Sequence, residues 1–201
     1  MIRVLLAEDQ AMVRGALAAL LTLEGDIEIV AQVGRGDEVV QAAQAAQPDV
    51  ALLDIEMPGT DGIVAAAALH KQLPTCKIII LTTFGRPGYL RRALESGAVG
   101  YLLKDAPATQ LASAIRKCMA GERVIDPALA VSALSSGENP LTEREREVLA
   151  VALKGASIAE IADTLALSEG TVRNYLSVAI QKLNAQNRVE AARIAEQNGW
   201  L

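Results

Sequence analysis

The chain has very few aromatic residues and no long hydrophobic run. Phe, Trp and Tyr make up only 2% of its 201 residues, although 51% of the chain is hydrophobic. The core must therefore be aliphatic, built from Ala, Val, Leu and Ile. No apolar stretch approaches the roughly 20 residues that a membrane-spanning helix needs, so we expect no membrane insertion.

Histidine and cysteine are also scarce. His70 is the only histidine, which argues against a histidine-based relay or metal cluster within the chain. Cys76 and Cys118 lack the spacing of metal or redox motifs, and such residues are more often buried and apolar than disulfide-bonded. Because the sequence runs directly from Met1 into a strand-like segment without a signal peptide, we expect a cytoplasmic protein.

Residues 1–120 alternate strand-like and helix-like segments five times, which predicts one α/β domain. The strand-like segments are Arg3–Ala7, Ile27–Val33, Val50–Leu53, Lys77–Thr82 and Gly100–Leu103. The helix-like segments are Gln10–Leu23, Asp37–Gln47, Gly62–Gln72, Pro87–Ser96 and Pro107–Ala120. The central strands are apolar throughout, as expected for strands buried on both faces. We therefore predict a flavodoxin-like, doubly wound, five-stranded parallel sheet with the strand order 2-1-3-4-5.

The pattern changes beyond residue 120. We predict a linker over residues 121–139, which is clearest in the Ser-, Gly- and Pro-containing segment 135–140. Residues 140–201 show no strand signal and should form a second, all-α domain. Its predicted helices are Glu143–Leu153, Ile158–Leu165, Glu169–Leu183 and Arg188–Gln197. Thr142 and Glu145 predict a capping box at the first of these helices, and Ser168 predicts the N-cap of the third.

Polar residues directly follow several of the predicted strands. They are Glu8, Asp9, Asp54, Thr82 and Lys104. Because the carboxyl ends of parallel strands line one crevice, three carboxylates, a hydroxyl and an ammonium group should converge there. Crowded carboxylates repel one another, and a Mg²⁺ ion held by oxygen ligands relieves that repulsion. The metal and Lys104 could then neutralise an incoming phosphoryl group while Asp54 attacks it.

The motifs LLAEDQ, LLDIEMPGTDG, IIILTTF and GYLLKD closely resemble those of response-regulator receiver domains, which have the CheY-like fold. The resemblance implies that Asp54 is the phosphoacceptor. It also implies that Asp9 and Asp54 hold Mg²⁺ directly, Glu8 through water and Glu56 through its backbone carbonyl. Thr82 would move to bond the phosphoryl oxygen, Tyr101 would rotate inward, and Lys104 would pair with the phosphoryl group.

Within the second domain, the middle helices are joined by the tight connection Ala166–Ser168, which is typical of a helix-turn-helix. The apolar stripe of the third helix is Val172, Leu176, Ala179, Ile180 and Leu183. The opposite face then presents Arg173, Asn174, Ser177 and Gln181. Arg, Asn and Gln side chains can read base edges in the major groove. Most surface helices have a solvated polar face, which would be the ordinary explanation of these residues. The position of this helix directly after a helix-turn-helix connection instead favours DNA binding.

The stretches LTEREREVL, IAEIADTLALSEGTVRNYLSVAIQKL and NRVEAAR resemble the LuxR/NarL (FixJ-type) output domain. That resemblance implies a four-helix DNA-binding module that pairs through its last helix. The implied contacts are bases or phosphates for Arg173, Asn174 and Ser177, and phosphates for Thr171 and Lys182. Val189 and Ala192 are the expected contacts between two copies. Tyr175 departs from the family's usual histidine, and Ser177 stands where a lysine is common, so one phosphate contact would be missing.

The charge balance bears on how such a module would be controlled. Residues 139–201 hold seven lysines and arginines against eight acidic residues, a net charge of −1. Since phosphate neutralisation dominates DNA affinity, one copy should bind weakly, and pairing should raise its effective concentration at DNA. We therefore expect phosphorylation to cause dimerisation, and dimerisation to permit DNA binding.

The sequence as a whole predicts a response regulator that receives phosphate from a histidine kinase and controls transcription at promoter DNA. The segments TTFGRPGYLRRAL, GYLLKDAP and GTVRNYLS most resemble those of DesR-type regulators, which suggests membrane-lipid or stress genes as targets.

Three alternatives are an aspartate-nucleophile phosphatase, a phosphorylation-independent DNA-binding protein and a flavin binder. The DIE sequence at Asp54 departs from the DxD of the phosphatases, and the intact acidic site argues against a degenerate receiver. Glu8 and Asp9 would repel a flavin phosphate.

Overall fold

The computed structural model describes residues 1–83, 87–127, 129–131 and 139–201. The chain divides into two compact units, of which the first contains Met1–Gly85 and Leu90–Ala130 and the second contains Val131–Leu201. Most of the Ser- and Gly-rich segment that was predicted to be a linker lies outside the described residues. None of the helices within the described ranges is long and apolar enough to cross a membrane.

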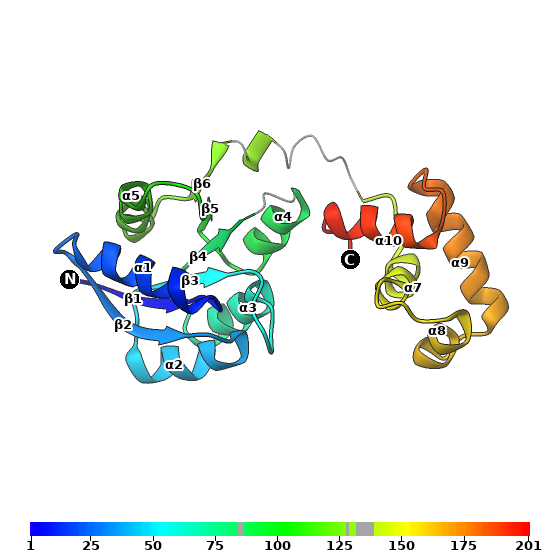
Figure 1. The fold of residues 1–201 in the computed structure, drawn as a ribbon, viewed down its shortest axis with the longest axis horizontal. Coiled ribbons are helices and arrows are strands. Elements are labelled where there is room, and N and C mark those ends of the chain that lie inside the picture. Colours follow the sequence, from blue (N-terminus) through cyan, green and yellow to red (C-terminus); the bar gives the residue numbers. More distant parts are fainter. Residues whose placement is uncertain (84–86, 128, 132–138) are drawn as a thin grey trace. The chain divides into compact units, whose positions relative to one another are not determined.

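The first unit is built on one parallel sheet (Figure 1). Its strands are β1 (Ile2–Ala7), β2 (Ile27–Val33), β3 (Val50–Asp54), β4 (Lys77–Thr82), β5 (Gly100–Leu103) and β6 (Val124–Ile125). Their order is β2-β1-β3-β4-β5-β6, and every neighbouring pair is parallel. The predicted order of the first five strands is confirmed, but the predicted number of strands is wrong. The sixth strand pairs Val124 with Gly100 and Ile125 with Tyr101, and two residues are too few to give a strand pattern in the sequence.

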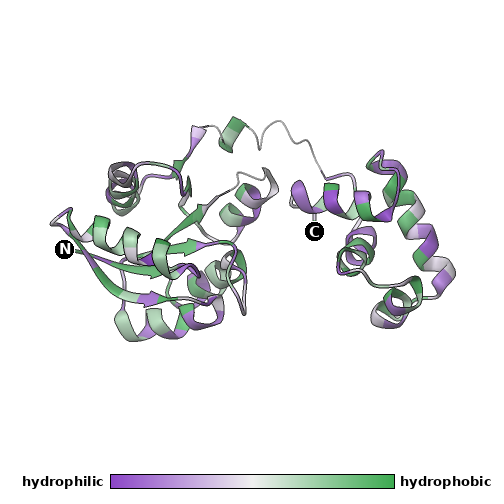
Figure 2. Cartoon of the chain, viewed as in Figure 1, coloured by the Kyte–Doolittle hydropathy of each residue, from purple (hydrophilic) through white to green (hydrophobic). Residues whose placement is uncertain are grey.

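Helices cover both faces of this sheet (Figure 1). They are α1 (Ala11–Thr22), α2 (Val39–Ala46), α3 (Gly62–Gln72), α4 (Pro87–Glu95) and α5 (Ala108–Met119), with a short 3₁₀ turn, η1 (Gly36–Glu38). Helices α1 and α5 pack together on one face, and α2 and α3 pack together on the other. Figure 2 shows the central strands as hydrophobic, and β3 is buried along its whole length. The aliphatic core that the composition predicted is therefore the sheet and the helix faces against it.

The second unit contains the helices α7 (Glu143–Leu153), α8 (Ile158–Leu165), α9 (Glu169–Lys182) and α10 (Arg188–Gln197). The predicted capping box of Thr142 and Glu145 is confirmed, as is the N-cap Ser168, whose hydroxyl accepts the Thr171 N–H at 3.1 Å. Helix α8 ends at Ala166, which has a φ of 52° and turns the chain toward α9. The apolar stripe of α9, including Val172, packs into the core of this unit. The result is a helix-turn-helix formed by α8 and α9.

Candidate functional site: an acidic pocket and a helix-turn-helix surface

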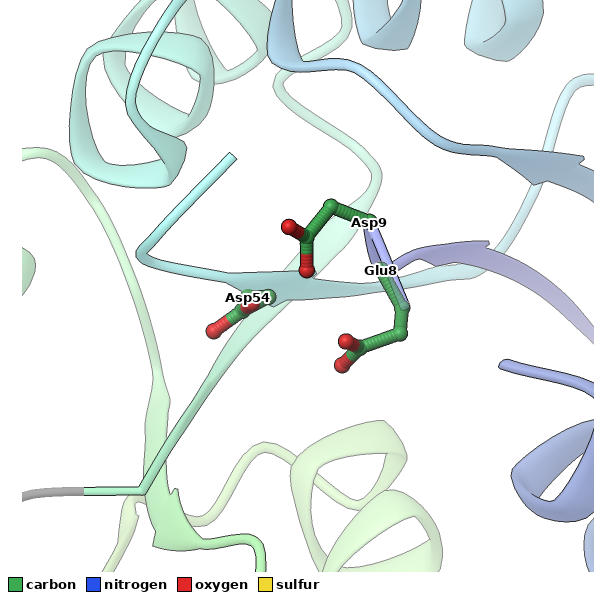
Figure 3. Close-up of side chains that lie close together, drawn as sticks. All are labelled: Glu8, Asp9 and Asp54. Carbon is green, nitrogen blue, oxygen red and sulfur yellow. The ribbon is translucent and has the colours of Figure 1, made fainter. Parts of the chain in front are cut away.

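The acidic residues of the first unit meet at the carboxyl edge of the sheet. Glu8 and Asp9 follow β1, and Asp54 is the last residue of β3. Because Ala7 pairs with Leu53 in the sheet, the strand ends that carry these acids lie side by side. Each of the three carboxylates offers an oxygen, and these oxygens all lie within 4.8 Å of one another (Figure 3). The predicted convergence of the three acids is therefore what the structure contains.

Lys104 supplies the positive charge beside them. Its Nζ lies 2.6 Å from Glu8 Oε2 and 2.8 Å from Asp54 Oδ2. The three side chains are 9%, 1% and 5% exposed, so the contact is almost closed to water. Asp9, by contrast, is exposed. The pocket thus has a dry interior around Lys104 and one carboxylate that faces solvent.

Burial shifts the titration of all three buried groups. Burial raises the pKa of Asp54 and of Glu8 above the ordinary values, and the hydrogen bonds to Lys104 offset only part of that rise. Burial alone would lower the pKa of Lys104, but its bonds to Asp54 and Glu8 outweigh this and hold that pKa above its ordinary value. The site therefore keeps a charged lysine beside carboxylates that are costly to ionise without a second cation.

The other predicted residues of this site come from β4 and β5. Thr82 is the buried last residue of β4, and its carbonyl accepts the Lys104 N–H at 2.8 Å. That bond ties the backbone of Thr82 to the residue that holds Asp54. Tyr101 is completely buried on β5, so in this structure it occupies an inward position. The structure thus places Thr82 at the edge where Lys104 and Asp54 meet, whereas Tyr101 lies further back, opposite Ile80 of β4.

The loop between β3 and α3 holds the backbone around Asp54. The loop ends at Asp61, the N-cap of α3, whose carboxylate accepts hydrogen bonds from the N–H groups of Ile63 and Val64. A Cβ on Gly62 would overlap the carbonyl oxygen of Asp54, so only glycine fits there. The side chain of Glu56 is exposed, and the contact of its backbone carbonyl with a metal stays a prediction.

The sequence analysis missed the roles of two residues around this pocket. One is Gly62, whose Asp-Gly dipeptide indicated a turn but not a close approach to Asp54. The other is Arg14 on α1, whose Nη1 donates to the Glu8 carbonyl at 2.5 Å and thereby holds the acidic turn. A basic residue in the first turns of a helix that follows two acids is the signal that could have indicated it.

The donor set fits a hard divalent cation. Glu8, Asp9 and Asp54 offer only oxygen atoms, which Mg²⁺ prefers, and Asp9 provides a solvent-facing ligand. A cation bound there would also reduce the repulsion between Glu8 and Asp54, which share one lysine. These three residues and the Glu56 carbonyl are the groups that could hold it.

The second unit carries an open polar groove over the first half of α9. Its volume is about 650 Å³, and it is lined by Ser168, Gly170, Thr171, Arg173, Asn174, Tyr175 and Ser177. Four of the predicted DNA contacts, Thr171, Arg173, Asn174 and Ser177, are among these residues. Arg173 is 60% exposed, and its guanidinium group bonds Glu169 one turn earlier at 2.6 Å. The groove is therefore a polar surface with an accessible cation.

The predicted phosphate contact of Lys182 and the predicted dimer contacts of α10 lie outside this groove. The ammonium group of Lys182 is already paired, because its Nζ bonds both carboxylate oxygens of Glu145. Ala192 is 0% exposed in the domain core, so the prediction that it contacts a second copy is wrong. The near-helical spacing of Val189 and Ala192 suggested one face, but α10 uses Ala192 to pack against the rest of its own domain. Val189 is 67% exposed and stays a candidate contact.

Comparisons with known proteins agree with both units. Residues 4–116 match the model of the response regulator receiver domain, and residues 139–195 match that of bacterial regulatory proteins of the luxR family. The uncharacterized transcriptional regulatory protein YvfU of Bacillus subtilis (strain 168) is 51% identical over 201 residues, and DesR of the same strain is 48% identical over 201 residues. Both alignments cover the whole of each chain.

Solved structures show the same architecture. Response regulator ChrA of a heme-sensing two-component system is 34% identical, with a TM-score of 0.60 over 100% of this chain and 98% of that one. The RcsB–DNA complex gives a TM-score of 0.70 at 23% identity, over 98% of each chain, and is similar in fold. The phosphatase and flavin-binder alternatives are thereby excluded. The chain belongs to the two-component response regulators that join a receiver domain to a LuxR-type DNA-binding domain, which are transcription regulators and not enzymes.

Proposed function

We propose that Asp54 accepts a phosphoryl group from a sensor histidine kinase and that this controls dimerisation and promoter binding. The observation that carries the proposal is the position of Asp54, buried at the end of β3 with its Oδ2 2.8 Å from Lys104. An Asp54 oxygen attacks phosphorus while the bond to the histidine nitrogen of the kinase breaks and its electron pair returns to the imidazole. Bound Mg²⁺ would neutralise charge on the transferring phosphoryl group.

The residues around Asp54 would respond to the new charge. Lys104 already contacts Asp54, so a small movement would bring its ammonium group to a phosphoryl oxygen. The Thr82 hydroxyl is the proposed partner of another phosphoryl oxygen, and Tyr101 is the proposed reporter of that movement. Since Thr82 and Lys104 are joined through their backbones, a change at one strand end would be passed to the other.

In the second domain we propose that the α9 groove binds promoter DNA. Arg173 and Asn174 would read bases, while Thr171 and Ser177 would contact bases or phosphates. The support is that these side chains line one open polar surface on the second helix of a helix-turn-helix. The net charge of −1 on residues 139–201 favours pairing of two copies as the condition for tight binding.

The phosphoacceptor is tested by intact-mass measurement after incubation with Mg²⁺ and acetyl phosphate. The unsubstituted protein should gain one phosphate, Asp54→Asn should gain none, and Asp105→Asn, which alters an exposed acid at the same sheet edge, should still gain one. Labelling that persists in Asp54→Asn would contradict the assignment. An unlabelled but DNA-binding protein would instead indicate the degenerate-receiver alternative.

The target genes are a separate proposal. The resemblance to DesR-type regulators suggests membrane-lipid or stress genes. Mapping of genomic binding sites with and without phosphorylation would identify them, and sites confined to unrelated operons would contradict this suggestion.

A further inference from the structure

Lys182 lies in an ion pair that the sequence analysis did not predict. Its Nζ is 3.0 Å from Glu145 Oε1 and 2.8 Å from Glu145 Oε2, so one ammonium group bonds both oxygens of one carboxylate. The Glu145 side chain is 5% exposed, and that of Lys182 is 32% exposed. The carboxylate is therefore largely withdrawn from water, and Lys182 provides its counter-charge.

Glu145 is itself fixed by the start of α7. Its Oε2 accepts the Thr142 N–H at 2.8 Å, while its own N–H donates to the Thr142 hydroxyl at 3.4 Å. Burial raises the pKa of Glu145, but the bonds from Lys182 and Thr142 outweigh that effect and leave the pKa below its ordinary value. Glu145 thus stays charged, and it links the first turn of α7 to the last turn of α9.

The second cation of α9 has a different environment. Arg173 pairs with Glu169, but both side chains are at least half exposed, and Arg173 lines the groove. Lys182 is not among the groove-lining residues of the described chain. For Lys182 to bind a DNA phosphate it would have to leave Glu145, and an unpaired buried carboxylate is strongly unfavourable. Arg173 can leave Glu169 at little cost, because exposed pairs contribute little.

We propose that Lys182 is a positioning residue of the DNA-reading helix and not a phosphate contact. Glu145 holds it, and the pair fixes the C-terminal end of α9 against α7 so that Arg173 and Asn174 project from a set position. This inference rests on the proposed binding of DNA by the α9 groove. It replaces the prediction, made from the family resemblance, that Lys182 contacts the DNA backbone.

The test is a double-substitution cycle in the full chain. The variants are Glu145→Gln, Lys182→Met and their combination, with Glu169→Gln, Arg173→Met and their combination as the matched exposed pair. Glutamine keeps the capping-box acceptor, so Glu145→Gln alters the charge and not the cap. The probe is a duplex selected by the unsubstituted protein from a random-sequence pool, and its affinity is measured over a series of salt concentrations. Circular dichroism confirms that each variant is folded.

Lys182→Met should weaken binding about tenfold without changing the salt slope. Glu145→Gln alone should also weaken binding, and the double variant should bind no worse than Lys182→Met, because the two residues act as one unit. The exposed pair should show no such coupling. A salt slope lowered by roughly one in Lys182→Met would identify a phosphate contact and overturn the inference. Tighter binding by Glu145→Gln would overturn it too, since that would mean that Glu145 merely restrains Lys182.

If Lys182→Met does not fold, the DNA affinity of Glu145→Gln decides the question. Weaker binding with an unchanged salt slope supports the positioning role, and tighter binding overturns it. Failure of the unsubstituted protein to select any duplex is a different result. It would contradict the proposed function and the inference together, whereas a changed slope contradicts the inference alone.

Discussion

At the scale of single residues, burial decides what each charged group does. Lys104 and Lys182 each pair with a buried carboxylate, although Lys182 itself is 32% exposed, whereas Arg173 pairs with an exposed carboxylate. A charge removed from water needs a partner, and removing that partner leaves a large cost. The exposed pair contributes little to stability, so the Arg173 guanidinium group can leave Glu169 at little cost.

Lys104→Met should destabilise the metal-free receiver by about 3–5 kcal/mol, because Glu8 and Asp54 then face each other without a counter-charge. Mg²⁺ should restore part of that loss, since the ion would neutralise the same carboxylates. Urea unfolding in EDTA and in Mg²⁺ measures both effects, with the exposed Lys71→Met as the control. Equal stability of Lys104→Met and the control in EDTA would count against the ion pairs.

Glu145 should make the stability of the second domain depend on acidity. Its folded pKa lies below the ordinary value of 4.5, so its stabilising contribution is complete above that value. The contribution is lost as the pH falls from about 4.5 through the lower folded pKa. Glu145→Gln should therefore lose less stability on acidification than the unsubstituted protein or Glu143→Gln, a change on the exposed side of α7. Urea unfolding at a series of pH values measures the difference, and parallel curves for all three would refute it.

At the scale of elements, the sequence predicted nearly all helices and strands, because long apolar runs and capping residues determine them locally. The strand β6 was missed because it has two residues, and Ala192 was misplaced because spacing along α10 does not tell which face the core occupies. The convergence of Glu8, Asp54 and Lys104 was predictable because strand ends share one edge. The bond between Lys182 and Glu145 was not, since it joins residues 37 positions apart through the packing of α7 and α9.

The junction between β3 and α3 should tolerate no side chain at Gly62. Gly62→Ala places a Cβ against the Asp54 carbonyl and should lower both stability and phosphorylation by acetyl phosphate. Gly15→Ala is the matched change, because a Cβ on Gly15 meets no atom within 4 Å. It should stabilise α1 by roughly 0.5–1 kcal/mol, since glycine weakens a helix interior. Unfolding curves and intact-mass labelling of the two variants test the contrast, and normal labelling of Gly62→Ala would contradict the proposed constraint on Asp54.

At the scale of the whole molecule, the charge balance bears on the proposed binding of DNA by two copies of the chain. The chain carries a net charge of −5 at pH 7, and its DNA-binding region is close to neutral. In the proposed function, affinity would then come from directed contacts of the α9 groove and from holding two such grooves together. A control that acts on pairing would therefore be effective even if each groove is unchanged.

Val189, an exposed apolar residue of α10, is the place to test pairing of the output domains. Val189→Glu should leave folding and Asp54 phosphorylation intact and should weaken DNA binding, because Val189 is exposed and a charge there would oppose close approach of two copies. Ala192→Glu should instead unfold the domain, because it buries a carboxylate in the core. Sedimentation, circular dichroism and DNA titration on both variants distinguish these outcomes. Unchanged DNA affinity of Val189→Glu would mean that α10 does not mediate pairing.

The central claim is that a phosphoryl group on Asp54 controls DNA binding by the α9 groove. The most direct measurement titrates the selected duplex with the unsubstituted protein and with Asp54→Asn, each with and without acetyl phosphate and Mg²⁺, while mass spectrometry follows phosphorylation of the same samples. The account predicts that affinity rises in step with the phosphorylated fraction and that Asp54→Asn shows neither change. Equal affinity of the phosphorylated and unphosphorylated protein, or a rise that persists in Asp54→Asn, would contradict it.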